Sequence, residues 1–290
     1  MSGGYKTITF PKSRLATVDV GRYAANMHAM LGLVEVDVTQ ARRVLRRMRR
    51  DGSGVSFTAW FMKTVADCVA KNPEAHAVRL RGRRLLIFDD VDIAIPVEKT
   101  VDGAVAPLPV LIKGANVKTL QQIDRELTDA MRVPVSTENE YILSEHGFAG
   151  IVLRLYYALP QRVRVAIWRL YFGNAFRSRR HTGTVTVTTV NGVGRTPGWV
   201  LPTRSIHGLT FALGTISAKP WVHDGHVVPR EILNLTVLFD HDVIDGAPAR
   251  RFILDLVRRL EKNDALRPLP NGRDQSDETS GSSETADAPV

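Results

Sequence analysis

The stretch Phe239-Asp240-His241-Asp242-Val243-Ile244-Asp245-Gly246 decides the fold of this chain. Upstream, apolar and polar residues alternate, and Leu235, Val237, Phe239 and His241 share one face of a predicted strand. Downstream, apolar residues recur at helical spacing, namely Ala249, Phe252, Ile253, Leu256, Val257 and Leu260. The sequence therefore predicts a histidine at the end of a strand and an aspartate four residues on, at a sharp turn into a helix.

His241 and Asp245 each have two interpretations. A rigidly held histidine can act as a general base near neutral pH, but it can also be a satisfied core residue. Asp245 can support that base, or it can cap the helix that begins near Pro248. We expect no metal site, because the two residues straddle a turn and no third ligand lies at a suitable spacing.

With the helix that follows it, the motif resembles the C-terminal signature of the catalytic domain of dihydrolipoamide acyltransferases, the core subunits of 2-oxoacid dehydrogenase complexes. Chloramphenicol acetyltransferase has a similar motif. Four further blocks resemble that domain in order: residues 33–39 its first strand, 56–74 its first long helix, 91–103 its central hairpin and 118–132 its second helix. The resemblance implies an α/β fold of the chloramphenicol acetyltransferase-like sandwich type, with a mixed sheet flanked by helices.

The resemblance also implies an acyltransferase. Such an enzyme moves an acyl group between coenzyme A, or a dihydrolipoyl thiol supplied in trans, and a thiol, hydroxyl or amine. His241 suits the base, and a second group must donate a hydrogen bond to the oxyanion. Relatives use a serine in a Phe-Thr-Ile-Ser strand, and Val185-Thr186-Val187-Thr188 places Thr188 at that position. The alternatives are Thr186, a backbone N–H near Asn191-Gly192, or threonines that simply face solvent on a strand.

Resemblance assigns the remaining motif residues supporting roles. In relatives the aspartate equivalent to Asp245 pairs with an arginine of the N-terminal arm, for which Arg14 is the candidate and Arg22 the alternative. Gly246 completes the turn. Asp242 departs from the family, since the complex-bound enzymes usually have arginine there. We expect this change of sign to alter acceptor choice or to stabilise the charged form of the base.

Bulk composition fits a soluble globular protein. The chain has 290 residues, with 44% apolar and 24% charged residues. No apolar run approaches the length of a membrane span, and Met1 to Lys6 lack the apolar region of a signal peptide. A single cysteine, Cys68, excludes an internal disulfide. We therefore expect a cytoplasmic protein.

The net charge of +9 is concentrated in arginine clusters at residues 42–50 and 177–180. Such clusters can face solvent, touch an anionic membrane or nucleic acid, or attract the phosphates of an acyl-CoA. We expect a solvated face for the first cluster and no nucleic-acid partner.

We predict three regions: an extended N-terminal arm (1–32), a catalytic domain (33–262) and a disordered acidic tail (263–290). An insertion at about 137–182 departs from the family. Its aromatics (Tyr156, Tyr157, Trp168, Tyr171, Phe172) interleave with arginines (Arg154, Arg162, Arg164, Arg169, Arg177). This pattern predicts a basic amphipathic helical hairpin that covers a pocket or a neighbouring subunit, or lies on a membrane.

The sequence shows no lipoyl or subunit-binding domain, so we expect a stand-alone catalytic domain with no lipoyl group on this chain. The resemblance implies a homotrimer with active sites between subunits, acyl-CoA as substrate and a separate lipoyl-bearing protein as a candidate partner. The alternatives are a catalytically silent trimeric scaffold or partner of a dehydrogenase complex, and a basic membrane or nucleic-acid binder.

Overall fold

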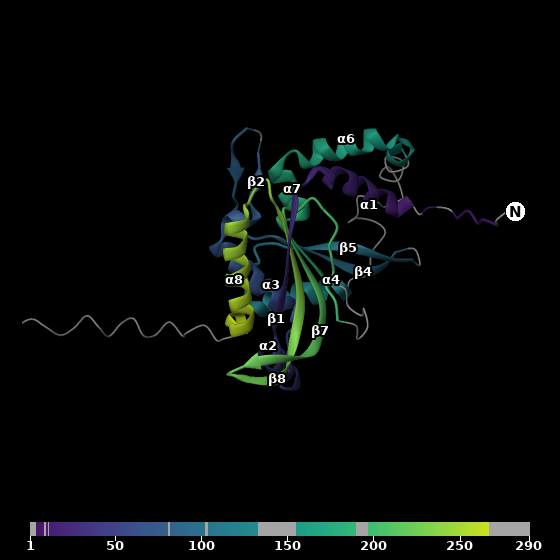
Figure 1. The fold of residues 1–290 in the computed structure, drawn as a ribbon. Coiled ribbons are helices and arrows are strands. Elements are labelled where there is room, and N and C mark those ends of the chain that lie inside the picture. Colours follow the sequence, from purple (N-terminus) through teal and green to yellow (C-terminus); the bar gives the residue numbers. More distant parts are fainter. Residues whose placement is uncertain are drawn as a thin grey trace, which may run out of the picture.

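A six-stranded mixed sheet forms the centre of the computed structural model, which describes residues 4–8, 10, 12–80, 82–101, 104–132, 155–189 and 197–266 (Figure 1). Its strands are β1 (Ala29–Asp37), β4 (Ile93–Val101), β5 (Ala104–Ile112), β6 (Val185–Thr189), β7 (Leu209–His223) and β8 (His226–Asp240). They lie in the order β1-β8-β7-β6-β4-β5. Strand β6 runs parallel to β4 and β7, and the other pairs are antiparallel.

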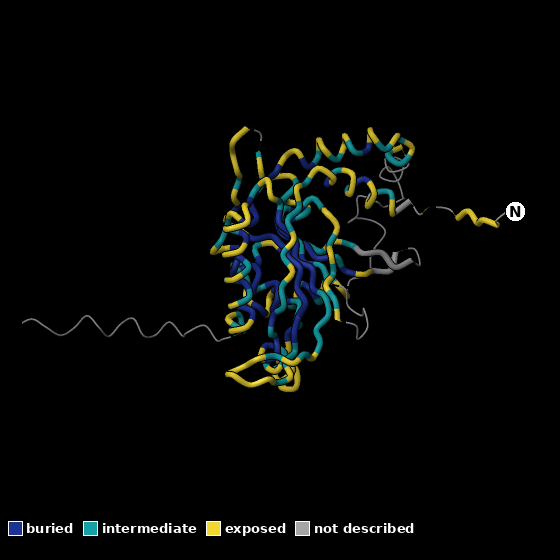
Figure 2. The backbone as a smooth tube through the Cα atoms, in the orientation of Figure 1, coloured by how far each residue is buried: buried dark blue, intermediate teal, exposed yellow. Residues whose placement is uncertain are grey.

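Helices supply the other half of the core. They are α2 (Thr39–Arg50), α3 (Phe57–Lys71), α4 (Leu120–Arg132) and α8 (Gly246–Lys262), with the short 3-10 helices η2 (Pro73–His76) and η3 (Asp264–Leu266). Buried apolar residues of all four helices and of the central strands form one cluster, visible as the dark interior of Figure 2. Phe211 of β7 and Phe252 of α8, with ring centroids 6.2 Å apart, mark the contact between sheet and helices. The predicted mixed sheet with flanking helices is confirmed.

Helix starts follow local capping. The Ser56 hydroxyl accepts a hydrogen bond from the Ala59 N–H (3.1 Å), as expected for the cap of α3. Thr39 is of a residue type that often caps helices, but it is the first residue of α2 rather than its cap. The carboxylate of Asp37 accepts from the Thr39 N–H (2.9 Å) instead.

In the described part of the chain, three antiparallel hairpins join neighbouring strands. The small pair β2 (Val78–Arg79) and β3 (Leu85–Leu86) is one, and β4–β5 and β7–β8 are the others. Asp224 and Gly225 at the β7–β8 turn have positive φ (50° and 78°), which is the two-residue turn that fits the twist of a hairpin. The pairs Arg81-Gly82 and Asp102-Gly103 also suit hairpin turns, but Arg81, Asp102 and Gly103 lie outside the described residues.

The N-terminal region is helical where an extended arm was expected. Helix α1 (Lys12–Tyr23) is followed by η1 (Ala24–Asn26), and β1 begins at Ala29 rather than at residue 33. Helix α1 packs on α6 (Gln161–Phe172) of the insertion. The physical reason is a buried pair: the Arg164 Nε donates to the fully buried carboxylate of Asp19 (2.7 Å).

The insertion contains helices as its pattern predicted. Pro160 precedes α6, and the side chain of Asn174 accepts from the Arg177 N–H (3.0 Å) to begin α7 (Ala175–Thr182). Residues 137–154 of the insertion and 267–290 of the predicted tail lie outside the described residues. None of the described helices has the length and apolarity needed to span a membrane.

Candidate active site

His241 is the first residue after β8, and its backbone is fixed there. Its N–H donates to the carbonyl of His28 (2.8 Å), extending the antiparallel pairing of Ala29 with Asp240 by one step. Its side chain is half exposed (50%), and Nδ1 lies 3.9 Å from the Asp245 carboxylate. The core-histidine interpretation is therefore wrong, and the imidazole is accessible to a substrate.

Asp245 stands at the N-cap of α8, but its side chain forms no capping hydrogen bond and is 86% exposed. The expected ion pair with Arg14 is not formed between these two described residues. The guanidinium of Arg14 lies 5.7 Å from the centroid of the Phe10 ring. Arg22 is exposed and makes no ion pair with Asp245 in the described part of the chain. At Gly246 an added Cβ would meet no atom of this chain within 4 Å.

Asp242 is engaged by residues that the motif did not suggest. The His28 Nδ1 lies 2.8 Å from its carboxylate, and the Arg79 guanidinium donates to the other oxygen (3.2 Å). These two contacts, that of His28 first, lower the pKa of the Asp242 carboxyl. Asp242 therefore forms its contacts with His28 and Arg79, and not with His241 as expected. The pairing of β1 with β8 is what places His28 beside His241, and residue spacing in the sequence does not indicate this.

Thr188 lies on β6, opposite Ala212 of β7, which in turn lies opposite Thr236 of β8. Its side chain is on the sheet face away from the buried Val187. Among the described residues no hydrogen bond engages its hydroxyl. The alternative donor Thr186 has a buried hydroxyl with no hydrogen-bond partner in the described structure. Asn191-Gly192 lies outside the described residues.

One chain does not bring Thr188 and His241 together. Thr188 is level with Thr236, two strands away, and His241 follows Thr236 by five residues. At roughly 3.4 Å per residue and 4.8 Å per strand, their separation is on the order of 20 Å. Two groups that far apart cannot act on the same reacting carbonyl, so a site using both needs two chains.

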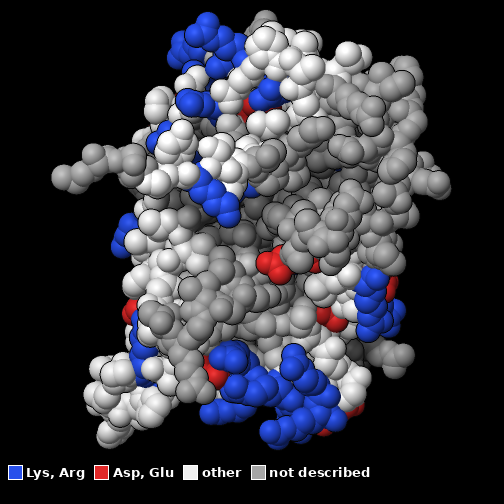
Figure 3. Space-filling model, turned by 90° about the vertical axis from the view of Figure 1, so that its right-hand side faces the viewer, with Lys and Arg blue, Asp and Glu red and all other residues white. Residues whose placement is uncertain are grey.

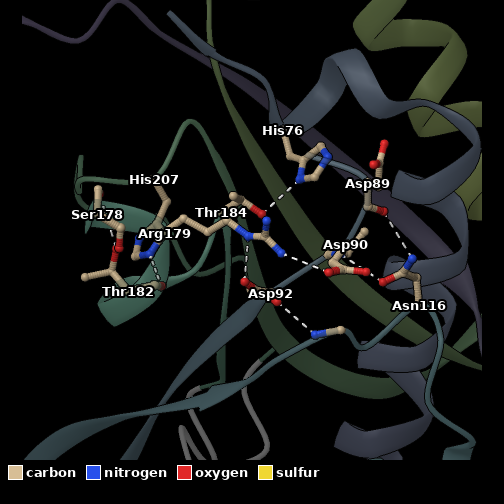
Figure 4. Close-up of polar contacts among 12 residues, drawn as sticks. His76, Asp89, Asp90, Asp92, Asn116, Ser178, Arg179, Thr182, Thr184 and His207 are labelled. Atoms are coloured by element: carbon tan, nitrogen blue, oxygen red, sulfur yellow. Dashed lines mark hydrogen bonds and ion pairs between the residues drawn. The ribbon is translucent and has the colours of Figure 1, made fainter. Parts of the chain in front are cut away.

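The start of β6 is held by a polar cluster (Figure 4). The N–H groups of Thr184 and Val185 both donate to the carbonyl of Asp92, and the His76 Nδ1 lies 2.8 Å from the Thr184 hydroxyl. Gly183 has a φ of +76°, and a Cβ there would sit 2.6 Å from the Asp92 carbonyl oxygen. Only glycine fits this close approach. The strand carrying Thr188 is thus positioned from its first residue.

Helix α7 is tied to the same cluster. The Arg179 guanidinium donates to Asp92 (2.8 Å) and Asp90 (3.2 Å), and the His207 Nε2 lies 2.7 Å from the carbonyl of Thr182 (Figure 4). Burial lowers the pKa of His207, and likewise that of His76, to about 4. Both imidazoles are therefore neutral at pH 7 and serve as hydrogen-bonding parts of the scaffold.

Metal binding and cysteine chemistry find little support in the described residues. Within the described ranges, no group of three or more His, Cys, Asp or Glu residues is arranged to hold a metal ion. Cys68 is buried, and burial raises the pKa of its thiol to about 12. It is therefore a thiol rather than a reactive thiolate at neutral pH.

Most of this chain matches the model of a known protein family. The family model described as 2-oxoacid dehydrogenases acyltransferase (catalytic domain) matches residues 16–134 and 181–267. The interval between these ranges contains most of the predicted insertion.

Curated relatives agree with this match. The chain is 23% identical over 209 residues to the dihydrolipoyllysine-residue acetyltransferase component of the pyruvate dehydrogenase complex of Mycoplasma pneumoniae, covering 72% of this chain and 42% of that protein. It is 24% identical over 241 residues to the lipoamide acyltransferase component of the branched-chain alpha-keto acid dehydrogenase complex of Bacillus subtilis, covering 80% and 46%. The chain spans somewhat less than half the length of these relatives.

Solved structures share the fold. A probable dihydrolipoamide acetyltransferase from Listeria monocytogenes superposes with a TM-score of 0.62 at 19% identity, covering 90% of this chain and 96% of that one. The dihydrolipoamide acetyltransferase of Azotobacter vinelandii superposes with a TM-score of 0.64 at 18% identity, covering 91% and 94%. The fold implied by the sequence blocks is confirmed.

Proposed function

Because this chain belongs to the family of 2-oxoacid dehydrogenase acyltransferase catalytic domains, we propose that it transfers an acyl group between coenzyme A and a thiol, hydroxyl or amine acceptor. His241 is the general base of this reaction and Thr188 the oxyanion donor. The observation that carries the proposal is the state of His241, whose backbone is anchored to His28 while its imidazole stays half exposed beside Asp245.

His241 can accept the proton of the acceptor as the acceptor attacks the thioester carbonyl, and it can return that proton to the CoA sulfur when the C–S bond breaks. The first of these steps needs the imidazole in its neutral form, with a free ring nitrogen to take the proton. Asp245, 3.9 Å from Nδ1, favours the tautomer in which Nδ1 carries the proton and Nε2 is the base.

Support for Thr188 comes from the Azotobacter vinelandii relative, whose structure belongs to a study of a serine, a histidine and an asparagine in its catalytic mechanism. In that protein the histidine precedes the asparagine by the same four positions that separate His241 from Asp245. The serine precedes the histidine by nearly the same length of chain as Thr188 precedes His241. A threonine keeps the hydroxyl that the oxyanion requires.

The separation of Thr188 from His241 within one chain supports a shared site. We propose a homotrimer in which His241 of one subunit faces Thr188 of the next. An acyl-CoA carries several phosphate charges, and the net charge of +9 favours its approach. A separate lipoyl-bearing protein is the proposed acyl partner if the acceptor is a dihydrolipoyl thiol.

The test is a screen of acyl-CoA and acceptor pairs that measures released CoA thiol. His241→Ala should lower turnover by about a hundredfold or more while the circular dichroism spectrum stays unchanged. The matched control is His226→Ala, an exposed histidine at the other end of β8, which should keep normal turnover. Full activity of His241→Ala would sink the mechanism, and a folded chain inactive with every pair would favour the silent scaffold.

A further inference from the structure

The helices α6 and α7 carry charge of a single sign. Residues 161–182 contain six arginines and no aspartate or glutamate. Arg164 and Arg179 turn inward to the carboxylates of Asp19 and of Asp90 and Asp92. The other four, Arg162, Arg169, Arg177 and Arg180, are exposed, and none of them has an acidic partner in the described part of the chain.

Helix α6, which carries Arg162 and Arg169, also has an exposed apolar stripe. Val163, Ile167 and Leu170 follow at the spacing of one helix face and are 43%, 43% and 80% exposed. Phe176 of α7 adds a ring that is 66% exposed. The opposite face of α6 is the packed one, where Phe172 lies 5.3 Å from the Tyr23 ring of α1. The stripe therefore lies on the outer face of α6, which faces away from α1.

A rigid support lies beneath this surface. The Asp19 carboxylate receives hydrogen bonds from Arg164 and from the Tyr156 hydroxyl, and the Trp168 Nε1 donates to that same hydroxyl. Helix α7 is held by Arg179 on the start of β4. Because both helices are fixed from within, the stripe needs no ordering when it meets a partner.

We propose that the α6–α7 face, made of Val163, Ile167, Leu170 and Phe176 with Arg162, Arg169, Arg177 and Arg180, docks on the surface of an anionic phospholipid bilayer. The apolar side chains enter the boundary between head groups and acyl chains, and the arginines contact lipid phosphates. The proposal is independent of the acyltransfer chemistry.

Charge decides between a bilayer and a second copy of this chain. The face offers arginines and no carboxylate, so two copies placed face to face would bring like charges together. An anionic bilayer supplies the missing negative charge together with an apolar layer. Helix α1, on which α6 rests, leads through η1 into the start of β1, so docking would hold the His28 and His241 end of the sheet near the membrane (Figure 1).

The test is co-sedimentation of the full chain with vesicles. We expect binding to vesicles of equal parts phosphatidylglycerol and phosphatidylcholine, none to phosphatidylcholine alone, and weakening with salt. Arg162→Gln with Arg169→Gln should weaken partitioning about fivefold per charge removed. Ile167→Ser with Leu170→Ser should weaken it about tenfold or more. Arg162→Lys with Arg169→Lys should preserve binding and shows that loss in the glutamine variant is not misfolding.

A matched control removes the same charge elsewhere. Arginines of α2 form a second basic cluster, and Figure 3 shows a large group of basic side chains at the lower end of the molecule, where Figure 1 places α2. Arg49→Gln with Arg50→Gln should leave vesicle binding unchanged. Equal loss in this control, or no binding to anionic vesicles, would overturn the proposal. So would a smaller particle mass of the α6 variants in light scattering, since that would make the face a contact between copies.

Discussion

A methyl group distinguishes Thr188 from a serine, the residue type studied in the Azotobacter vinelandii relative. β-Branching restricts the rotamers of the hydroxyl but does not remove the donor. The position of the hydroxyl matters as much as the residue that carries it. The hydrogen bonds around Asp92 fix the start of β6, and Thr188 follows later on the same strand. A donor held this way can be aimed at an oxyanion without reorganisation.

Substitutions at Thr188 should separate the hydroxyl from the side-chain shape. Thr188→Ser should keep turnover within a few fold, and Thr188→Val should lose roughly two to three orders of magnitude, because one oxyanion donor is worth that much. Steady-state kinetics of released CoA measures both. Thr186→Val is the neighbouring control and should stay active. The reverse result, with Thr186→Val inactive and Thr188→Val normal, would move the donor to Thr186.

The positions of single residues could be predicted where the motif is local. The alternation before His241 and the stripe after Gly246 placed the histidine at a strand end and Asp245 at a helix start, as observed. His28 and Arg79 were missed because they reach Asp242 from distant segments. The Arg14 pairing rested on resemblance alone, and the helix containing Arg14 packs on α6, a segment that lies outside the matched family ranges.

At the scale of elements, α1 depends on one buried ion pair. Asp19 is fully buried and Arg164 is 8% exposed, so removing either partner strands the other charge in the interior. Burial by itself would raise the pKa of the Asp19 carboxyl, but the bonds from Arg164 and Tyr156 outweigh it and lower that pKa.

We predict that Asp19→Ala costs about 3 kcal/mol in the stability of the α1–α6 contact. Since that contact lies outside the main core cluster, the loss should appear first as local opening. Hydrogen exchange should accelerate in α1 and α6 and stay slow in α3 and α8. Arg162→Ala, an exposed arginine on the same helix, should leave exchange unchanged. Uniform acceleration across the chain would contradict a local role.

The buried histidines should make stability depend on pH. His76 and His207 have folded pKa values of about 4, below the ordinary value of 6.5, so the unfolded chain binds protons first as the pH falls. Stability is therefore complete above pH 6.5 and is lost as the pH falls toward 4. At pH 5 the loss should be on the order of 2 kcal/mol for each histidine.

Denaturant unfolding at pH 7.5 and pH 5 measures this loss. The variant with His76→Gln and His207→Gln should show a flatter dependence on pH than the parent, whatever its absolute stability. His223→Gln, on the exposed β7–β8 hairpin, is the control and should keep the parent slope. An unchanged slope in the double variant would assign the acid sensitivity to other groups.

Elements with a continuous apolar stripe were predictable, as α3, α4 and α8 show. Helix α1 was not, because its sequence has weak periodicity and its partner Arg164 lies far along the chain. Apolar residues continue from α6 into α7, but the helix is divided there, since Gly173 ends α6 and Asn174 caps α7. A glycine and a cap together interrupt a pattern that apolar spacing would continue.

At the scale of the whole molecule, the distance between Thr188 and His241 within one chain implies that a site using both residues needs at least two subunits. If each site draws one residue from each of two subunits, an inactive His241→Ala chain and an inactive Thr188→Val chain carry complementary defects. Refolded together, they should regain a fraction of the parent activity, while each refolded alone stays inactive.

Light scattering gives the second measurement in that experiment, the mass of the particles. The parent should have the mass of three chains, and mixed particles should be verified before activity is compared. A monomer mass, or verified mixed trimers without any activity, would refute the shared site. A mixture of His241→Ala with the double variant His241→Ala and Thr188→Val is the negative control, since no site in it has the histidine.

The order of strands was the part of the architecture least open to prediction. A hairpin has a local signal in its turn residues, as the Asp224-Gly225 pair between β7 and β8 shows. The insertion of β6 between β4 and β7, parallel to both, has no local signal. It depends instead on Asp92, Thr184 and Arg179, which come together only in the folded chain.

Strand β1 pairs along its whole length with β8, which comes last along the chain among the described strands of this sheet. A ribosome making this protein therefore releases β1 long before its partner exists. At roughly 5–20 residues per second, the wait is on the order of ten seconds or more. During that time Leu31 and Leu33 belong to an unpaired strand. Such a strand has free backbone N–H and C=O groups and is prone to aggregate with other nascent chains. His28 and His241 meet only at the end of synthesis, so the end of the sheet that carries the proposed base is the last part to be completed.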